Sequence, residues 1–407
     1  MKRDIERLMA ERDLGALIVT GKILGNPPMK YLVGDAGLTT AIIVKIRGGK
    51  TILVHGVMER EEARSTGFEL MDFEVFGFTE IIRQGKSPME AQKELLKRII
   101  GRLGIRGKVG LYGRLEVSRY FALMQELSGE LDGVEWRWER EEDLFSAARL
   151  TKDKDEIGAI RSVGERTSIV IDEVVQLLRS AKRSKGILID PESKKPLKVR
   201  DVKRQIALSL AKQGLLEEEE TIFSIGYDTA VPHNRGKVDD TIGVGQPIIF
   251  DIFPADPRSG YYYDVTRSMV VGDPPEEFLR LYEDVRCACE TAAGLLAEGK
   301  SASGVNDAVI EYFQKKGHPT LQTKGNFTEG YCHGLGHGIG LDVHEQPALS
   351  LAPMPHDRFE KGMVFTVEPG LYYPGRSIGV RIEDVYFINE DGVGEKVVEI
   401  PEVYHID

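Results

Sequence analysis

Two apolar segments in the C-terminal half each carry one aspartate at a position that a strand would bury. Residues 247–253 read PIIFDIF around Asp251, and residues 261–271 read YYYDVTRSMVV around Asp264. Because the short connection contains prolines and a glycine, the two strands are expected to pair antiparallel and to bring both carboxylates together. A bare carboxylate inside an apolar strand is very costly. The chain must therefore supply either an ion pair, for which Arg267 is a nearby base, or a cation site.

A second cluster of polar residues spans positions 333–344, where the chain reads HGLGHGIGLDVH. It places His333, His337 and His344, three of the eight histidines, within twelve residues and among glycines. Glycine permits close backbone approach and unusual dihedral angles. Histidine is the commonest nitrogen ligand of transition metals. This density favours a ligand site over three separate structural histidines.

Two further carboxylates follow in apolar surroundings. Glu368 ends the apolar run VFTV and precedes a Pro-Gly turn. Residues 379–387 read GVRIEDVYF and are expected to form one strand. Period-two alternation then places Arg381 and Glu383 on the same face of that strand. Glu383 is thus a further candidate ligand with a guanidinium beside it.

The charges of these acids would balance two divalent cations. Asp251, Asp264, Glu368 and Glu383 contribute four negative charges, whereas His337 is neutral as a ligand. Oxygen-rich ligands with one imidazole favour Mn²⁺, Co²⁺ or Fe²⁺ over a thiolate-type zinc site. Two adjacent metals are a hydrolytic device because they activate water and stabilise an oxyanion. The pattern predicts a hydrolytic site with two divalent metals, Mn²⁺ first, with Co²⁺, Fe²⁺ or Zn²⁺ as alternatives.

The pattern of helices and strands divides the chain near residue 150. Residues 1–150 alternate helical and strand-like segments, which is typical of an α/β domain. In residues 151–407 a pair of helices is followed by glycine-rich β segments, and this order occurs twice. This is an α+β pattern that suggests internal duplication. Strands are expected in the first domain over residues 16–20, 40–46, 51–54 and 108–112, the middle pair forming a hairpin. Helices are expected over residues 2–13, 90–103, 155–182, 199–213, 274–298 and 302–316.

Two segments need a separate interpretation. Residues 294–301 read GLLAEGKS, a literal phosphate-loop motif, but that motif functions between a strand and a helix. Here a helix is expected from Pro274 to the glycine at position 299, so nucleotide binding is not expected. Residues 184–198 are polar and rich in turn residues, and they are expected to form an exposed loop.

The composition argues against several partners. The chain has 65 acidic and 54 basic residues, a net charge of −11, whereas nucleic acid binding needs an excess of Lys and Arg. No apolar run approaches the roughly 18 residues of a membrane span. Three cysteines, an odd number, argue against a disulfide framework and favour reduced thiols. Because the charged N-terminus also differs from a signal peptide, a cytoplasmic location is expected.

Taken in order, these motifs resemble the metallopeptidase family of methionine aminopeptidase, aminopeptidase P, prolidase and creatinase. The matching segments are VPH ending at His233, DVTR from Asp264, HGLGHGIGLDVHE from His333, EPG from Glu368 and RIED from Arg381. The N-terminal half, with NPPMKYLVGDAG at residues 26–37, resembles the creatinase-type domain of the family. The resemblance covers nearly the whole chain. It implies an α/β creatinase-like domain over residues 1–150 and an α+β pita-bread catalytic domain over residues 151–407.

The resemblance also implies a role for each motif residue. Asp251 would bind one metal, Asp264 and Glu383 would bridge both, and His337 and Glu368 would complete the set of ligands around the other metal. Glu368 would in addition shuttle a proton. The residues expected to line the site, contact substrate or support a ligand are His233, His333, His344 and Arg381.

The implied activity is hydrolysis of the Xaa-Pro bond in dipeptides or at the N-terminus of short peptides, by a homodimer. Dipeptidase and aminopeptidase P activities stay open, because either Arg258, Arg376 or the N-terminal domain is a possible clamp for a C-terminal carboxylate. Hydrolysis of a non-peptide C–N bond and a non-catalytic peptide-binding scaffold are the alternatives. Methionine aminopeptidase is less favoured, because that activity needs no creatinase-like domain. The longer connection over residues 252–263 and the segment 184–198 depart from the family pattern and bear on substrate identity.

Overall fold

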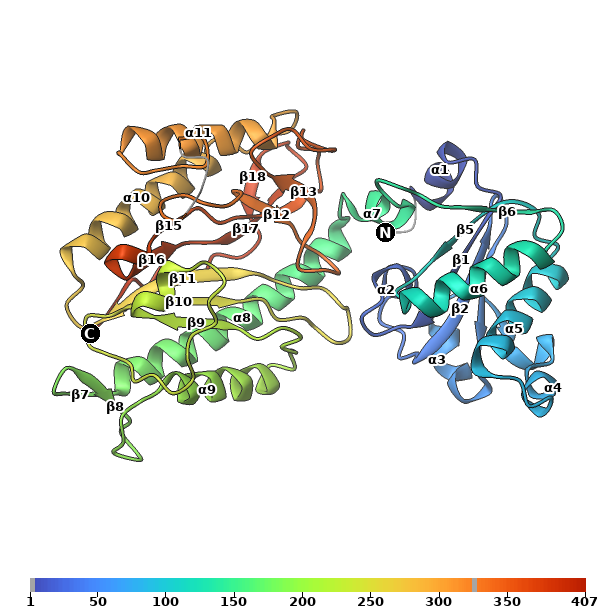
Figure 1. Cartoon of the computed structure of the whole chain (residues 1–407), viewed down its shortest axis with the longest axis horizontal. Coiled ribbons are helices and arrows are strands. Elements are labelled where there is room, and N and C mark those ends of the chain that lie inside the picture. Colours follow the sequence, from blue (N-terminus) through green and yellow to red (C-terminus); the bar gives the residue numbers. More distant parts are fainter. Residues whose placement is uncertain (1–3, 324–327) are drawn as a thin grey trace. The chain divides into compact units, whose positions relative to one another are not determined.

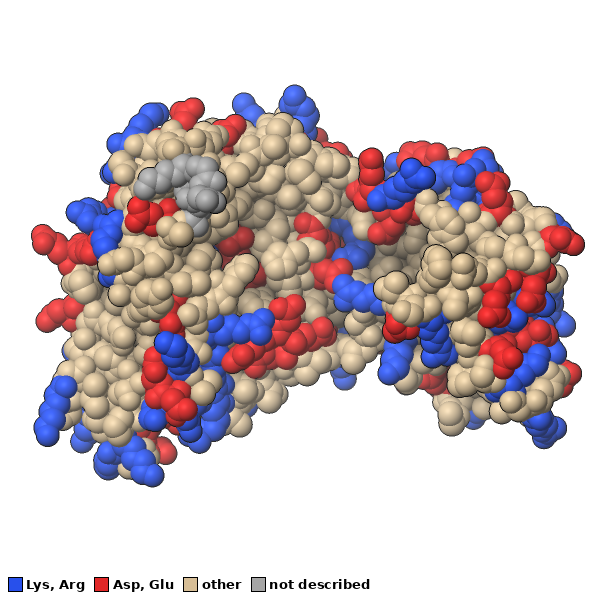
Figure 2. Space-filling model, viewed as in Figure 1, with Lys and Arg blue, Asp and Glu red and all other residues tan. Residues whose placement is uncertain are grey.

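The structure is a computed structural model that describes residues 4–323 and 328–407. It divides into two compact units, one formed by the chain up to Arg149 with Arg258–Gly260, the other by Leu150–Pro257 with Tyr261–Asp407. Each unit has its own sheets and helices (Figure 1). On the face drawn in Figure 2, basic and acidic side chains are interspersed. None of the helices in the described ranges is long and apolar enough to cross a membrane.

The N-terminal unit is built on one mixed sheet with the strand order β4-β3-β2-β1-β5-β6. In this sheet β1 is antiparallel to β2 and parallel to β5. Its strands are β1 (Ala16–Lys22), β2 (Thr40–Ile46), β3 (Thr51–His55), β4 (Glu69–Asp72), β5 (Gly107–Tyr112) and β6 (Val134–Arg137). Its helices are α1 (Asp4–Glu11), α2 (Pro27–Val33), α3 (Arg60–Ser65), α4 (Phe78–Arg83), α5 (Pro88–Arg102), α6 (Val117–Glu130) and α7 (Leu144–Arg149), with short 3₁₀ turns η1 (Val57–Glu59) and η2 (Phe73–Phe76).

The elements predicted in this unit are confirmed within the described residues. The four predicted strands are β1, β2, β3 and β5, and the predicted hairpin joins β2 to β3. Helix α5 begins two residues before the predicted start because Ser87 caps it. The Ser87 hydroxyl accepts from the Glu90 N–H, and the Glu90 carboxylate accepts from the Ser87 N–H at 2.8 Å. The helix predicted over residues 2–13 corresponds to α1. Residues 2 and 3 of the predicted range lie outside the described residues.

The C-terminal unit contains a sheet with the order β19-β11-β10-β9, a second sheet with the order β13-β12-β14-β17-β18, and the ribbons β15-β16 and β7-β8. Its helices are α8 (Lys154–Ser180), α9 (Val199–Lys212), α10 (Glu276–Ala293) and α11 (Ala302–Lys315), with 3₁₀ turns η3 (Gly226–Ala230) and η4 (Pro374–Arg376). Its strands are β7 (Lys182–Ser184), β8 (Ile187–Ile189), β9 (Ile222–Ile225), β10 (Pro247–Ile252), β11 (Val265–Val271), β12 (Gly336–Gly338), β13 (Glu345–Leu349), β14 (Val364–Val367), β15 (Gly370–Tyr373), β16 (Ile378–Arg381), β17 (Asp384–Ile388), β18 (Gly394–Lys396) and β19 (His405–Ile406).

The chain of this unit twice forms a helix pair followed by antiparallel strands, as the sequence pattern predicted. Helices α8 and α9 precede β9 to β11, and helices α10 and α11 precede β12 to β17. Figure 1 shows one helix pair on each side of the strands. The two sheets meet where the Thr266 position of β11 forms a bridge with Glu383. This junction brings the predicted ligands of both halves together.

The helix predicted over residues 274–298 is shorter at both ends. It begins at Glu276, because the residue before a proline is disfavoured in helical geometry and Pro274 precedes Pro275. It ends at Ala293, with Gly294 rather than Gly299 at its C-terminus. The segment GLLAEGKS therefore joins α10 to α11 and follows a helix, as expected for a chance match to the phosphate-loop motif.

Two other predictions are wrong in part. Residues 184–198 are not simply an exposed loop, because β8 pairs with β7 and the apolar side chains of Leu188 and Leu197 are buried. Residues 379–387 are not one strand. The chain leaves β16, which pairs with β15, and enters β17, which pairs with β14, so Glu383 lies between two strands.

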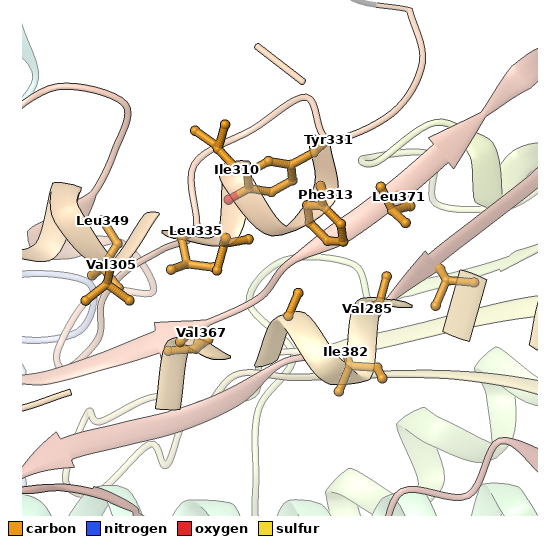
Figure 3. Close-up of a cluster of buried hydrophobic side chains, with 14 of the residues drawn as sticks. Val285, Val305, Ile310, Phe313, Tyr331, Leu335, Leu349, Val367, Leu371 and Ile382 are labelled. Atoms are coloured by element: carbon orange, nitrogen blue, oxygen red, sulfur yellow. The ribbon is translucent and has the colours of Figure 1, made fainter. Parts of the chain in front are cut away.

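An apolar cluster beneath these strands supports the site. It contains side chains from α10, α11 and the C-terminal strands, including Val285, Phe313, Val367, Leu371 and Ile382. Figure 3 shows them packed together. Burial of each large apolar side chain contributes roughly 1.5–3 kcal/mol. This cluster therefore holds the strand ends that carry the predicted ligands.

Candidate metal centre

One cavity of about 520 Å³ in the C-terminal unit is lined by all nine residues that were predicted to bind metal, line the site or support a ligand. Its walls come from the loop after η3, from β10 and β12, and from the segments that follow β14 and β16. The selected residues that line it are His233, Asp251, Asp264, His333, His337, His344, Glu368, Arg381 and Glu383.

Alternation along the strands separates these side chains from the core. Ile382 is 1% exposed and belongs to the apolar cluster, whereas its neighbours Arg381 and Glu383 line the cavity. Val367 is likewise in the cluster, and the next residue, Glu368, lines the cavity. The predicted common face of Arg381 and Glu383 is therefore present even though the strand is broken between them.

Three of the predicted ligands offer atoms that could share one ion. The ligand atoms of Asp264, His337 and Glu383 all lie within 4.8 Å of one another. Oε1 of Glu368 is 3.6 Å from Nε2 of His337, which is 3.8 Å from Oδ2 of Asp264. Asp251 lies on β10, paired in register with the residue two positions after Asp264. All five predicted ligands therefore converge on one place.

The buried carboxylates carry more negative charge than the surrounding protein neutralises. Oδ1 of Asp251 and Oδ1 of Asp264 are buried without a hydrogen-bond partner among the described residues. Burial, followed by the charges of Glu383, Asp251 and Glu368, raises the pKa of Asp264 well above its usual value. Burial likewise raises the pKa of Glu383 well above its usual value and that of Glu368 to about 7. Bound cations would relieve this repulsion and satisfy the free oxygens.

His337 reaches the cluster because its glycine neighbours let three strands approach closely. A Cβ at Gly336 would lie 2.0 Å from a backbone oxygen of β14, and one at Gly338 would lie 2.1 Å from a backbone oxygen of β13. Burial and the nearby His344 lower the pKa of His337 to about 4, so its ring is neutral, the form that binds metals. The glycines at positions 334 to 340 lack positive φ values. The close approach that glycine permits is present, and these positions do not use its freedom to adopt positive φ.

Arg381 is fixed beside the carboxylates by several hydrogen bonds. Its side chain is 3% exposed. Nη2 donates to Oδ2 of Asp251 at 2.6 Å, Nη1 donates to the hydroxyl of Tyr372 at 2.8 Å, and Nε donates to Oγ1 of Thr266 at 3.2 Å. Burial would lower the pKa of Arg381, but the nearby Tyr372 and the acids raise it well above its usual value. Arg381 therefore stays charged and orients Asp251.

Arg267 is not the base that pairs with these aspartates, although Asp251 does pair with Arg381 at 2.6 Å. Arg267 donates from Nη2 to Oδ1 of Asp384 at 2.7 Å and to the backbone oxygen of Ile400 at 2.7 Å. It therefore belongs to a separate buried pair. Asp264 has no basic partner of this kind among the described residues, which strengthens the cation interpretation.

Tyr372 and Thr266 are site residues that the sequence analysis missed. The Thr266 hydroxyl donates to Oε2 of Glu383 at 2.7 Å, and the Tyr372 hydroxyl lies 2.9 Å from Nε2 of His333. Alternation along β11 was the available signal for Thr266, which shares a face with Asp264. Tyr372 carried no such signal, because only the pairing of β15 with β16 brings it to the site.

The remaining histidines line the cavity wall. The His344 ring centroid lies 4.2 Å from that of His337. Burial and the charge of Arg381 lower the pKa of His333 to about 4. His233 is exposed after η3, and the preceding Pro232 accepts a hydrogen bond from Arg381 at 3.3 Å. These rings are available as donors or acceptors for a bound molecule.

A buried ion pair holds the loop that carries His344. Nζ of Lys152 lies 3.0 Å from Oε2 of Glu345, and their side chains are 2% and 6% exposed. Oε1 of Glu345 accepts from the backbone N–H groups of Leu341 and Asp342 at 2.6 and 3.0 Å. Glu345 thus connects the start of the C-terminal unit to the histidine loop.

Replacing Lys152 with methionine should destabilise the C-terminal unit by about 3–5 kcal/mol, because the variant breaks the buried ion pair between Lys152 and Glu345. Urea unfolding measures the loss. Lys154→Met is the matched control, since its pair with Glu390 is 84% and 81% exposed and such pairs contribute about 0–1 kcal/mol. The double variant Lys152→Met with Glu345→Met should recover most of the stability. Equal effects of Lys152→Met and Lys154→Met would contradict the prediction.

The donor set fits divalent cations. Four carboxylates and one neutral imidazole face a single cavity, and two carboxylate oxygens lack other partners among the described residues. Such oxygen-rich sets suit Mn²⁺, Fe²⁺ or Co²⁺. With cations bound, the cavity could hold a carbonyl group and a water molecule next to a carboxylate and several imidazoles. Groups of these kinds are found together in the active sites of hydrolases.

Sequence comparisons agree with this chemistry. Residues 158–390 match metallopeptidase family M24. An uncharacterized peptidase of Methanocaldococcus jannaschii is 30% identical over 275 residues, which cover 66% of this chain and 70% of the relative. An Xaa-Pro dipeptidase of Lactobacillus delbrueckii subsp. lactis is 28% identical over 250 residues, 61% of this chain and 60% of the relative. The match thus spans less than two thirds of that dipeptidase.

Solved structures match over nearly the whole chain. The X-Pro aminopeptidase of Thermotoga maritima superimposes with a TM-score of 0.76 at 23% identity. The superposition covers 98% of this chain and 100% of the aminopeptidase chain. The prolidase of Pyrococcus horikoshii OT3 has a TM-score of 0.72 at 22% identity, with 98% of each chain covered. They confirm the predicted fold, an α/β creatinase-like domain followed by an α+β pita-bread domain. Together with the family match over more than half of its length, this establishes that the chain belongs to metallopeptidase family M24.

Proposed function

We propose that the cavity hydrolyses the peptide bond before proline, in Xaa-Pro dipeptides or at the N-terminus of short peptides, with two divalent cations bound. The observation that carries the proposal is the convergence of five metal-ligating side chains and three further histidines on one cavity. The relative named an Xaa-Pro dipeptidase supports this substrate class.

Five side chains would hold the cations, with Asp264 and Glu383 assigned to both ions. Bound cations would polarise the substrate carbonyl and acidify water. The proposed metal is Mn²⁺ first, then Co²⁺, Fe²⁺ or Zn²⁺, because the donors are mainly oxygens. The full proposed set is Asp251, Asp264, His337, Glu368 and Glu383.

Glu368 carries the proton transfer in this proposal. Its side chain is 20% exposed, more open to the cavity than that of Asp264 at 6%. A carboxylate within reach of water and of the leaving nitrogen takes a proton from the first and delivers it to the second. His233 and His344 are exposed at the wall and would donate hydrogen bonds to the carbonyl oxygen, where negative charge develops. His333, oriented by Tyr372, would contact the substrate.

A peptide panel with metal-depleted and metal-restored protein tests the proposal. Chelation should reduce cleavage of Xaa-Pro peptides below detection, and Mn²⁺ should restore it, with about two metals bound per chain by elemental analysis. Cleavage of matched Xaa-Ala peptides should be much slower. The proposal fails if no Xaa-Pro peptide is cleaved with any of Mn²⁺, Co²⁺, Fe²⁺ or Zn²⁺.

The alternatives give different results in the same panel. Cleavage confined to dipeptides indicates a dipeptidase, and cleavage of longer Xaa-Pro peptides indicates an aminopeptidase P. A protein that binds peptides but no metal would be a scaffold. Turnover of a non-peptide C–N substrate alone would indicate a different hydrolase. The complete donor set favours catalysis over the scaffold.

The homodimer and the cytoplasmic location stay predictions. The three cysteines are free thiols in the structure. Sedimentation at several protein concentrations tests the dimer. Cell fractionation tests the location.

A further inference from the structure

Two arginines, Arg235 and Arg381, line the cavity, and Arg381 already binds protein groups. Arg381 is 3% exposed and donates to Asp251, Tyr372 and Thr266. It cannot turn toward a ligand without leaving Asp251 buried and unpaired, which is costly. Arg235 is the other cation among the described residues of the wall.

Arg235 forms only a weak ion pair, with Glu219, and its guanidinium could bind another carboxylate instead. Its Nη2 lies 3.5 Å from Oε2 of Glu219, which also lines the cavity, and their side chains are 47% and 67% exposed. An exposed pair of this length contributes about 0–1 kcal/mol. Guanidinium and carboxylate form stronger, two-pronged hydrogen bonds when their planes align. A carboxylate delivered by a ligand can therefore replace Glu219.

The position of Arg235 suits the far end of a dipeptide. It follows His233 by two residues, and both side chains line the cavity that contains the proposed ligands. In an Xaa-Pro dipeptide the free carboxylate lies one residue beyond the scissile bond, a reach of roughly 3.3–3.6 Å along an extended chain. Arg235 lines this cavity from the loop after η3, on a side chain long enough to adjust to such a carboxylate.

The two arginines suggested by the sequence do not line this cavity. Arg376 donates from Nη1 to Oε1 of Glu277 at 2.7 Å, and its guanidinium lies 3.6 Å from the Tyr373 ring centroid. It borders a separate cavity with Arg280. Arg258 groups with the N-terminal unit. Neither arginine lines the cavity in which the carboxylate would bind.

We propose that Arg235 binds the free C-terminal carboxylate of an Xaa-Pro dipeptide by exchange with Glu219, and so selects dipeptides over longer or amidated peptides. The inference rests on the proposed function, because it assumes that Xaa-Pro peptides occupy the cavity. A longer peptide presents a neutral amide at this point, which leaves the pair of Arg235 and Glu219 in place.

The test compares three substrates: an Xaa-Pro dipeptide, its C-terminal amide, and the same sequence extended by one residue. Arg235→Met in the metal-restored protein should reduce the ratio of kcat/KM for the dipeptide to that for the amide by about 10- to 100-fold, the value of a charge-assisted hydrogen bond. The change should arise in KM. Arg235→Lys, which keeps the charge without the two-pronged geometry, should lie between wild type and Arg235→Met.

Matched variants separate binding from general effects. Arg204→Met removes an arginine that is 75% exposed and outside the cavity, and it should leave the ratio at the wild-type value. Glu219→Gln removes the competing carboxylate and should raise the ratio. Inhibition by free proline should weaken in Arg235→Met, whereas inhibition by prolinamide should change less.

The outcomes distinguish this inference from the function on which it rests. A wild-type protein that cleaves none of the three peptides overturns the proposed function and the inference with it. A wild-type protein that cleaves them, with an unchanged ratio in Arg235→Met, overturns the inference alone. Loss of dipeptide and amide cleavage to the same extent also overturns it.

Discussion

Replacing Asp264 with asparagine is expected to abolish metal binding and peptide hydrolysis. Asp264 is assigned to both ions, and its Oδ1 has no other partner among the described residues. The amide keeps the shape of the side chain but removes the negative charge that attracts a cation. Activity should fall by more than about 10³-fold, since several kcal/mol of charge stabilisation depend on the metals. Elemental analysis after gel filtration measures the bound metal, and the peptide panel measures the rate.

The same variant is expected to stabilise the protein when metal is absent. Burial and neighbouring acids raise the pKa of Asp264 in the folded chain. Between the unfolded and folded pKa values the folded state holds a proton that the unfolded state has lost, so metal-free stability decreases as pH rises through this window. Asparagine removes that penalty. At pH 7 the metal-free variant should exceed metal-free wild type by roughly 1–4 kcal/mol.

Asp172→Asn provides the control, because Asp172 is an exposed acid on α8 of the same unit. It should alter neither metal content nor metal-free stability. With Mn²⁺ present the order should reverse, so that wild type is more stable than Asp264→Asn, since ligands that bind only the folded state stabilise it. A variant that binds metal like the wild type would falsify the assignment of Asp264.

Much of the site was predictable because its residues break the pattern of their surroundings. Asp251 interrupts the apolar strand β10, Asp264 comes directly before the apolar strand β11, and the glycines around His337 permit an approach that a Cβ would block. Such anomalies are local and can be read from a few residues. The α/β and α+β halves were predictable for a similar reason, since helix and strand periodicities are local properties.

The parts that could not be predicted depend on contacts distant in sequence. Tyr372 reaches Arg381 only through the pairing of two strands, and Lys152 meets Glu345 across 193 positions. The break at Glu383 is a change of partner strand, for which the apolar alternation gives no sign. The position of Arg235 in the cavity wall could not be predicted, because its loop has no regular period. The arginines suggested by the sequence, Arg258 and Arg376, do not line this cavity.

Glu368→Gln is expected to separate proton transfer from metal binding. The glutamine side chain retains an oxygen that can face the cations, but it cannot take a proton from water and deliver it to the leaving nitrogen. General acid–base catalysis contributes roughly 10²–10⁴-fold, so kcat should fall by about that factor. KM should change less, because Arg235 and the wall histidines would still contact the substrate.

Comparison with Asp264→Asn makes the Glu368 result decisive. Glu368→Gln should retain more metal than Asp264→Asn while losing most of its kcat, because the Glu368 side chain is more exposed to the cavity and is the proposed proton carrier. Glu360→Gln, an exposed acid just before β14, should behave as wild type. If Glu368→Gln keeps kcat within tenfold of wild type with its metal in place, another group moves the proton, and His344 is the next residue to substitute. If both variants lose metal equally, Glu368 is needed for metal binding as much as Asp264 is, and the expected separation of proton transfer from metal binding is wrong.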